Sequence, residues 1–440
     1  MQQGTIQAMS HASTNEHFIH KNLPFNLTVN LLDGGFFGLA LGFASFITVI
    51  PLFVSQMTDS ALLIGLVPAI HNVGWLLPQL LTAGWISRAK HIKPLVLWTT
   101  IHERIPFLGL AVVAWFLPHL NADTALILTF ILLAWQGFGG GFAANAWTSL
   151  ITKIMPTHLH GTFFGAQMAA FTGLEGFSAI VSGLILDHLD GPLDFTLCFL
   201  AASVSLVISF LFISLTREPD GQPRPTEGKP AGFWKESKRI LKANANFVAF
   251  LAMRSLSQFA AMAFSFYIVY VVWTFGVSEA ETGLMTGVFL MTSILSGLVM
   301  GRLADRWSPR MVMAAGGLAA SLSAAIALGA PSANWFYASF ILTSLAIVAI
   351  WTIPLPLTVR FGTEEERPYY IGLSSTLTAP ATILAPVLGG WLADSVGFQA
   401  TFMVSIMCGL LMAAMLVFVV KDPPRAQPVA PSPVMRTPIE

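Results

Sequence analysis

The sequence contains little charge. Only 10% of its 440 residues are Asp, Glu, Lys or Arg, whereas 55% are hydrophobic, and the mean hydropathy is +0.71. A soluble domain carries about 25% charged residues, and a large share of its surface has to be wetted by water. A water-soluble fold is therefore excluded, and lipid is the expected solvent. The 22 bases balance the 22 acids without forming a basic patch, so nucleic acid is excluded as a partner.

Cysteine is nearly absent, and no residue spacing predicts a metal, nucleotide or catalytic site. Cys198 and Cys408 fall in apolar runs, where thiols behave as small apolar residues, so neither a disulfide framework nor a zinc site is expected. The stretch GFGGGFAAN at 137–145 lacks the Lys-Ser or Lys-Thr ending of a phosphate loop, and close helix packing explains it. We expect no cofactor, and the sequence does not predict an enzyme.

What the sequence does contain is a series of long apolar runs. A membrane-crossing helix needs about 20 apolar residues, and lipid admits only helices or closed barrels. The runs do not alternate with period two, so they predict an all-α polytopic membrane protein. We expect twelve transmembrane helices, near residues 27–53, 61–87, 94–117, 124–150, 161–186, 195–215, 246–274, 280–300, 311–330, 335–357, 369–393 and 399–420.

The positions of Lys and Arg predict the orientation. Twenty of the 22 lie in the two terminal segments and in the loops after even-numbered runs, and the remaining two are Arg104 and Arg254 inside runs. The loops after odd-numbered runs contain acids instead, such as Asp59, Asp123 and Asp190. The positive-inside rule therefore places both termini and all even-numbered loops in the cytoplasm of a multi-pass cell-membrane protein.

The longest connection divides the chain into two halves of six helices. It runs over 216–245, is rich in proline and charge, and ends in GFWKESKRILK, which suits either a short helix on the inner membrane surface or a solvated linker. The expected organisation is a cytoplasmic tail, a first bundle, this linker, a second bundle and a second cytoplasmic tail, at 1–26, 27–215, 216–245, 246–420 and 421–440.

The two halves repeat each other at an offset of 207 residues. This offset aligns Asp187 with Asp394 at the ends of runs 5 and 11, and it also aligns Lys153 with Arg360 and Gly165 with Gly372. A doubled six-helix unit is typical of a carrier, in which two bundles rock against each other around a central site.

The stretch GRLADRWSPR at 301–310 places four charges between two uncharged runs. It resembles the signature loop of the major facilitator superfamily, with matches at Gly301, Asp305, Arg306 and Arg310. The resemblance covers about residues 27–420 and implies two pseudo-symmetric six-helix bundles. It also implies a cytoplasmic gate, in which the glycine lets helices approach and the aspartate reaches the positive end of a neighbouring helix.

The first half departs from this family pattern at two places. The corresponding loop, AGWISRAKHIKP, keeps Gly84 but has Arg88 at the position of the aspartate. In run 4, the arginine that proton antiporters place three residues before a Gln-Gly pair is replaced by Leu133, ahead of Gln136.

Ionisable residues inside the runs mark candidate functional sites, because they are costly to insert into a membrane. As candidates for substrate binding or proton coupling we consider Asp33, His71, Glu103, Arg104, Glu175 and Arg254.

Each candidate also has a structural interpretation. Asp33 is either a proton carrier or a residue salt-bridged to an arginine, and Glu103 and Arg104 either brace helices or line the pathway. His71 shares a helix face with Trp75 and Gln79, which suits a substrate-facing stripe or a satisfied interhelical histidine. Arg254 lies near a helix end, from which it could also reach the interface. At least two of the four residues Asp33, His71, Glu103 and Glu175 are expected to face a central cavity.

Together these observations predict a secondary active transporter that moves a small solute by alternating access. Proton-coupled efflux of a neutral or amphipathic compound is one form of this function. A passive uniporter and a transport-incompetent sensor or assembly protein on the same scaffold are the alternatives. The expected partners are the solute, protons and the lipid bilayer, and the expected functional unit is a monomer.

Overall fold

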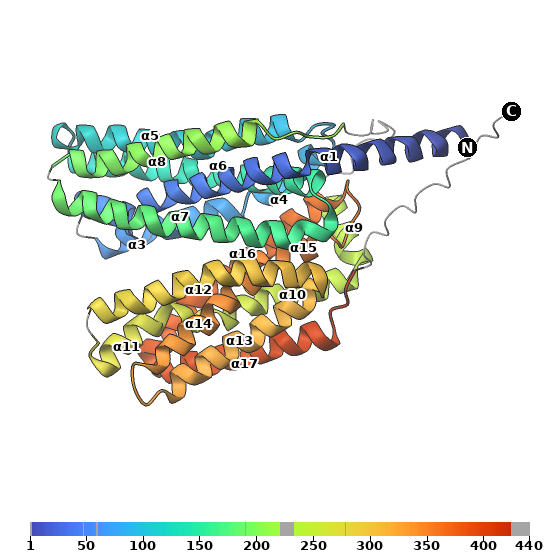
Figure 1. Ribbon diagram of the computed structural model, residues 1–440. Coiled ribbons are helices and arrows are strands. Elements are labelled where there is room, and N and C mark those ends of the chain that lie inside the picture. Colours follow the sequence, from blue (N-terminus) through green and yellow to red (C-terminus); the bar gives the residue numbers. More distant parts are fainter. Residues whose placement is uncertain are drawn as a thin grey trace.

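The structure is a pair of helical bundles joined by a long connection (Figure 1). The computed structural model describes residues 2–46, 48–58, 60–189, 191–220, 233–277 and 279–423, and regular structure in these ranges is helical. The N-terminal bundle contains α1 (Gln2–Phe43), α2 (Val49–Ser55), α3 (Ala61–Leu76), α4 (Gln79–Ile86), α5 (Lys93–Phe116), α6 (Ala122–Ile154), α7 (His160–His188) and α8 (Leu193–Ser214). The C-terminal bundle contains α10 (Ala245–Ala260), α11 (Tyr267–Phe275), α12 (Glu279–Arg306), α13 (Pro309–Gly329), α14 (Trp335–Ile347), α15 (Pro354–Thr358), α16 (Arg367–Ser395) and α17 (Phe398–Phe418).

The helices agree with an all-α membrane protein of twelve crossings. Ten helical segments among the described residues are long and apolar enough to span a bilayer. The other two crossings are formed by α1, which packs against α7 and α8, and by α3 together with α4, which pack against α6. The expected run 27–53 is therefore divided between α1 and α2, and α1 extends back to Gln2 through the polar N-terminal residues.

Several crossings are interrupted where proline removes a backbone donor. Pro78 separates α3 from α4. A π-helical turn, Val348–Thr352, leads from α14 to Pro354 at the start of α15. Pro380, by contrast, lies within the continuous helix α16. The interruptions at Pro78 and Pro354 free backbone groups beside the space between the bundles.

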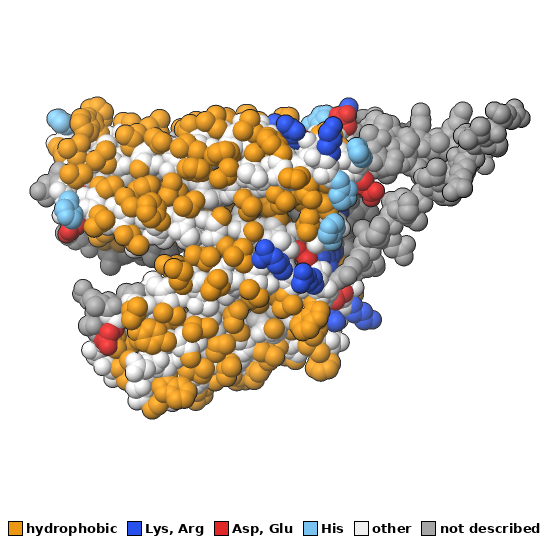
Figure 2. All heavy atoms as spheres, in the orientation of Figure 1, with side chains coloured by type: hydrophobic (Ala, Val, Ile, Leu, Met, Phe, Trp, Pro, Cys, Tyr) orange, Lys and Arg blue, Asp and Glu red, His pale blue; other side chains and the backbone are white. Residues whose placement is uncertain are grey.

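One end of the molecule carries the loops after the even-numbered runs, and we call it the basic end and the opposite one the far end. Lys and Arg gather toward the basic end in Figure 2, whereas hydrophobic side chains cover the sides of both bundles. Many large apolar side chains on these sides are exposed, including Leu211, Leu295 and Val387. In a bilayer such side chains contact lipid, which agrees with a multi-pass membrane protein.

The connection between the bundles contains a short amphipathic helix at the basic end, α9 (Phe233–Ala243). Its Ile240 is buried in the apolar core of the C-terminal bundle, whereas Lys235 and Lys238 are exposed. Arg239 pairs with Glu236 on the same helix and with Glu366 of the C-terminal bundle, which raises the pKa of the guanidinium. The preceding part of the expected linker, 221–232, lies outside the described residues.

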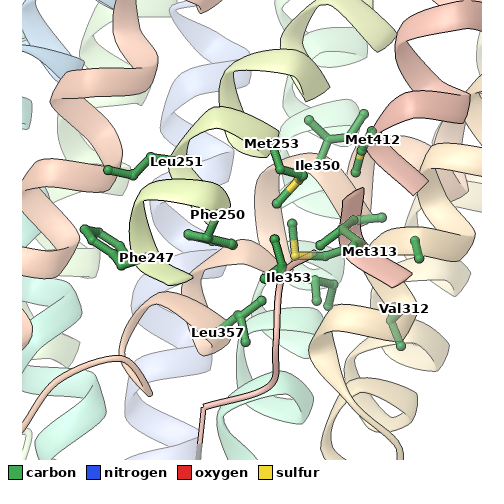
Figure 3. Packing of buried hydrophobic residues seen from close by; sticks show 14 of the residues in the cluster. Phe247, Phe250, Leu251, Met253, Val312, Met313, Ile350, Ile353, Leu357 and Met412 are labelled. Carbon is green, nitrogen blue, oxygen red and sulfur yellow. The ribbon is translucent and has the colours of Figure 1, made fainter. Parts of the chain in front are cut away.

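Each bundle has an apolar core, and the core of the C-terminal bundle also takes in Leu80 and Ala83 of α4. Figure 3 shows the core of the C-terminal bundle, where Phe247, Phe250 and Met253 of α10 pack near Ile353 and Met412. Lipid is as apolar as these side chains, so the bundle is held mainly by close packing rather than by exclusion of water. Each bundle is therefore suited to move as a unit.

Glycines allow the bundles to touch along α7 and α12. A Cβ atom added at Gly165 of α7 would overlap the carbonyl oxygen of Gly297 on α12, and one added at Gly301 would overlap the carbonyl oxygen of Gly161. Glycine at these positions brings the two backbones together at the basic end. The contact closes the space between the bundles on that side.

Replacing Gly165 by alanine is therefore expected to open the basic end. The added methyl group meets backbone rather than a flexible side chain, so the closed arrangement should lose about 1–3 kcal/mol relative to the open one. Distances between spin labels on the basic ends of α7 and α12 measure the shift. Gly183→Ala, on the same helix but with nothing within 4 Å of its Cβ position, is the matched control and should leave the distances unchanged. Equal distances in both variants would contradict this account of the contact.

Candidate functional site

A cavity of about 510 Å³ lies between the two bundles. At the far end Figure 2 shows a notch between the bundles, whereas at the basic end they are in contact. Three tryptophans, Trp75, Trp147 and Trp351, line the cavity together with Phe37 and Phe171. The remaining lining side chains are mostly small or polar, and the charged ones are Asp33, Glu103, Arg104 and Arg254.

The N-terminal wall holds two carboxylates around one arginine. Asp33 of α1 and Glu103 and Arg104 of α5 are largely buried. Arg104 Nη2 lies 3.4 Å from Asp33 Oδ1, and Arg104 Nη1 lies 3.9 Å from Glu103 Oε2. Although neighbours on a helix point about 100° apart, both Glu103 and Arg104 reach the cavity because the arginine has a long stem. With all three groups ionised, this wall carries one excess negative charge.

The two carboxylates differ in their hydrogen bonds. The Ser209 hydroxyl donates to Asp33 Oδ1 at 2.6 Å, and Arg104 donates to the Ser209 hydroxyl at 2.9 Å and to the carbonyl oxygen of Leu206 at 3.3 Å. Asp33 is thus salt-bridged to an arginine, Arg104, which is one of the two interpretations that the sequence left open. Glu103 touches this network only through the longer contact to Arg104. Its carboxylate is therefore the less constrained of the two.

The C-terminal wall carries Arg254 as its charge. This residue lies about nine residues into α10 and lines the cavity. Its Nη1 donates to the carbonyl oxygen of Ile350 in the π-helical turn, and its Nε is buried without a partner. Hydroxyl and amide side chains line the same wall, including Gln258, Thr378 and Thr382.

Two of the sequence candidates lie outside the cavity lining. His71 Nδ1 is 2.9 Å from Gln136 Oε1, and its ring stacks on Phe46 with centroids 3.9 Å apart. It is a satisfied interhelical histidine, although Trp75 and Gln79 do line the cavity. Glu175 is half-buried and follows Phe171 of the lining by one turn of α7 toward the far end. Asp33 and Glu103 are thus the two of the four expected residues that face the cavity.

The signature loop forms a contact between the bundles at the basic end. The Asp305 carboxylate accepts hydrogen bonds from the backbone N–H groups of Gly161, at 2.8 Å, and Thr162, at 2.5 Å, in the first turn of α7. An acid at this position also interacts favourably with the helix dipole. Gly301 lies in the glycine contact, whereas Arg306 is exposed and Arg310 binds the Val420 carbonyl oxygen and Asp422 within the C-terminal bundle.

On the other side of the basic end, a different set of residues joins the bundles. In the first half, Arg88 stands where the family loop has its aspartate. There Asn145 of α6 donates to the carbonyl oxygens of Gln79, at 2.7 Å, and Pro368, at 3.0 Å. Thr376 of α16 donates to the carbonyl oxygen of Leu77 beside the proline break, at 3.3 Å. These residues were not among the candidates predicted from the sequence. The available signal was a single amide or hydroxyl group within an otherwise apolar run.

Asp305→Asn is expected to weaken the closure of the basic end. The amide keeps one acceptor oxygen but loses the negative charge and one of the two charge-assisted hydrogen bonds, which should destabilise the closed arrangement by about 1–3 kcal/mol. The effect is measured as a change in the fraction of molecules with a closed basic end. The same spin-label distances report this fraction. Asp187→Asn removes an exposed acid from the far end of α7 and is the matched control. An unchanged population in Asp305→Asn would show that the glycine contact closes this end without the carboxylate.

Comparison with known proteins gives consistent similarities. A sequence profile described as the Major Facilitator Superfamily matches residues 251–439. The chain is 23% identical over 383 residues to multidrug resistance protein 1 of Bacillus subtilis (strain 168), which covers 84% of this chain and 90% of that protein.

Solved structures have the same fold. The E. coli fucose:proton symporter superimposes with a TM-score of 0.73 at 14% identity, covering 89% of this chain and 98% of the symporter. A bacterial homologue of the iron transporter ferroportin, in an outward-facing state, superimposes with a TM-score of 0.70 at 15% identity, covering 89% and 98% of the two chains. The duplicated six-helix architecture expected from the sequence is thus confirmed at the level of the fold.

Proposed function

The chain belongs to the major facilitator superfamily, and we propose that it exports an amphipathic small molecule in exchange for protons. Membership makes it a secondary transporter of a small solute. The observation that carries the finer proposal is the cavity between the bundles, in which two carboxylates share one arginine. The similarity to a multidrug resistance protein favours export of an amphipathic compound.

Glu103 is the proposed proton-exchanging group. Asp33 is held by Ser209 and Arg104, so its charge is compensated, whereas Glu103 lies farther from the shared guanidinium. A carboxylate that is buried and only partly compensated binds a proton readily, because the protonated form avoids a charge in a poorly solvated site. Protonation of Glu103 would leave Asp33 and Arg104 as a neutral pair.

Alternating access follows from the contacts at the basic end. We assign this end to the cytoplasm, because it carries the Lys and Arg residues. The arrangement then faces outward, with Asp305, Asn145 and the glycine contact holding the cytoplasmic side closed. Opening to the cytoplasm requires these contacts to break while the two bundles, 27–215 and 246–420, tilt about the cavity. The linker and amphipathic helix at 216–245 would stay on the cytoplasmic side, and the transporter would act as a monomer in the cell membrane.

Transport by the purified protein in proteoliposomes should depend on a proton gradient through Glu103. We expect wild-type exchange of amphipathic aromatic compounds to increase when the compartment reached by the far end is made acidic. Glu103→Gln should lose about tenfold or more of this gradient-dependent component, because the amide cannot exchange a proton. Asp187→Asn, which removes an exposed acid at the far end, should retain it.

Two outcomes of this experiment would contradict the proposal. Transport that ignores the gradient in the wild-type protein would identify a passive uniporter. Transport that remains gradient-dependent in Glu103→Gln and fails in Asp33→Asn would move the coupling to Asp33. A trapped pH-sensitive dye reports proton movement in the same vesicles, so loss of solute binding is distinguished from loss of coupling.

A further inference from the structure

Arg254 is a cation at the cavity without an acidic partner in the described part of the chain. Its only hydrogen bond there is to the carbonyl oxygen of Ile350, and its Nε is buried and unpartnered. The ion pairs of the cavity, by contrast, are confined to the opposite wall around Arg104. A guanidinium at membrane depth is costly unless an anion or hydrogen-bond acceptors compensate it. Its planar donor groups fit a carboxylate in particular.

A second unpartnered hydrogen-bonding group lies on the same wall as Arg254. Helices α10 and α16 both run from the basic end toward the far end, and Thr382 of α16 donates to Gln258 of α10 at 3.3 Å. Arg254 and Thr378 each precede one of these residues by four positions, so each lies on the same helix face one turn nearer the basic end. Thr378 lines the cavity, is 2% exposed and has a hydroxyl group without a partner. The two side chains therefore lie at one level of the C-terminal wall.

The opposite wall has the complementary charge. Asp33, Glu103 and Arg104 leave one excess negative charge on the N-terminal side, and Arg254 places one positive charge on the C-terminal side. The lining as a whole is neutral but divided, with a cation on one wall and a surplus carboxylate on the other. Trp75, Trp147 and Trp351 add flat aromatic surface to the same lining. Such a cavity is complementary to a net-neutral molecule with an aromatic body and opposite charges at its two ends.

We propose that Arg254 and Thr378 form a carboxylate-binding subsite, and that the transported substrate is an aromatic zwitterion. Its carboxylate binds the donors of Arg254 and Thr378, and its ammonium group faces Glu103. This inference rests on the proposed function and deepens it, because an ammonium group at Glu103 competes with the proton there. Proton release and substrate binding are then linked at one side chain, as exchange requires.

Binding of three matched compounds tests the subsite. The probes are the para-substituted aminomethyl-biphenyl-carboxylic acid, which is a zwitterion, its methyl ester, which keeps only the cation, and its N-acetyl derivative, which keeps only the anion. Isothermal titration calorimetry with the full chain in lipid nanodiscs measures their affinities. We expect the zwitterion to bind about tenfold or more tightly than either derivative, because each derivative lacks one charge-assisted contact.

Variants of the subsite should change this preference selectively. Arg254→Gln should weaken binding of the zwitterion and the N-acetyl derivative by about tenfold or more while leaving the ester unaffected. Arg254→Lys, which keeps the charge but not the planar fork, should give an intermediate loss, and Thr378→Val should act in the same direction. Arg302→Gln, at an exposed arginine outside the cavity, and Thr292→Val, at a threonine bonded within its own helix, are the matched controls.

The outcomes separate this inference from the proposed function. Equal binding of the zwitterion and its ester by the wild-type protein would overturn the subsite without any variant being needed. So would an unchanged preference in a folded Arg254→Gln protein. If the preference holds but vesicle transport of the zwitterion ignores a proton gradient, the subsite stands and proton exchange fails. If gradient-driven transport is seen only for compounds without a carboxylate, the proposed function stands and the subsite fails.

Discussion

The lack of water inside a bilayer is the constraint on which the structure depends. A backbone carbonyl, hydroxyl or charge in the membrane has to find its partner within the protein. Where helices are broken at Pro78 and Pro354, the neighbouring carbonyl oxygens are used by groups from other helices. Thr376 donates to Leu77, and Arg254 donates to Ile350. The breaks therefore lie beside the interface between the bundles, where protein groups can reach them.

The same constraint separates structural charges from functional ones. Asp33, Arg104 and Ser209 compensate one another and hold α1, α5 and α8 together. Glu103 and Arg254 are less fully compensated, and both border the cavity. A side chain whose compensation is incomplete in the empty cavity interacts strongly with whatever enters it, whether a proton or a solute group. This difference, rather than burial alone, separates the residues expected to act in transport from those that brace the bundle.

The basic end is closed by two chemically different contacts. On the side of α7 and α12, an aspartate accepts hydrogen bonds from two backbone N–H groups next to a glycine contact. On the side of α4 and α16, Asn145 and Thr376 donate to backbone carbonyl oxygens. The duplicated halves thus share an architecture, but they close the basic end through different contacts. The charged contact is sensitive to the helix dipole, whereas the neutral one depends on the geometry of the proline break.

The sequence by itself determined the membrane environment, the number of crossings, the duplication and the identity of the charged candidates, because hydropathy and charge placement are local properties. It could not decide which candidates meet. Asp33 and Glu103 are 70 residues apart and share Arg104, and Thr378 lies on the same wall as Arg254 only because α10 and α16 pack in parallel. The sequence left His71 either on the substrate-facing stripe of Trp75 or as a satisfied interhelical histidine, and the packing of α3 turns its ring toward Phe46 and Gln136. Helix rotation and helix pairing are set by packing across the whole bundle, and only the tertiary structure fixes them.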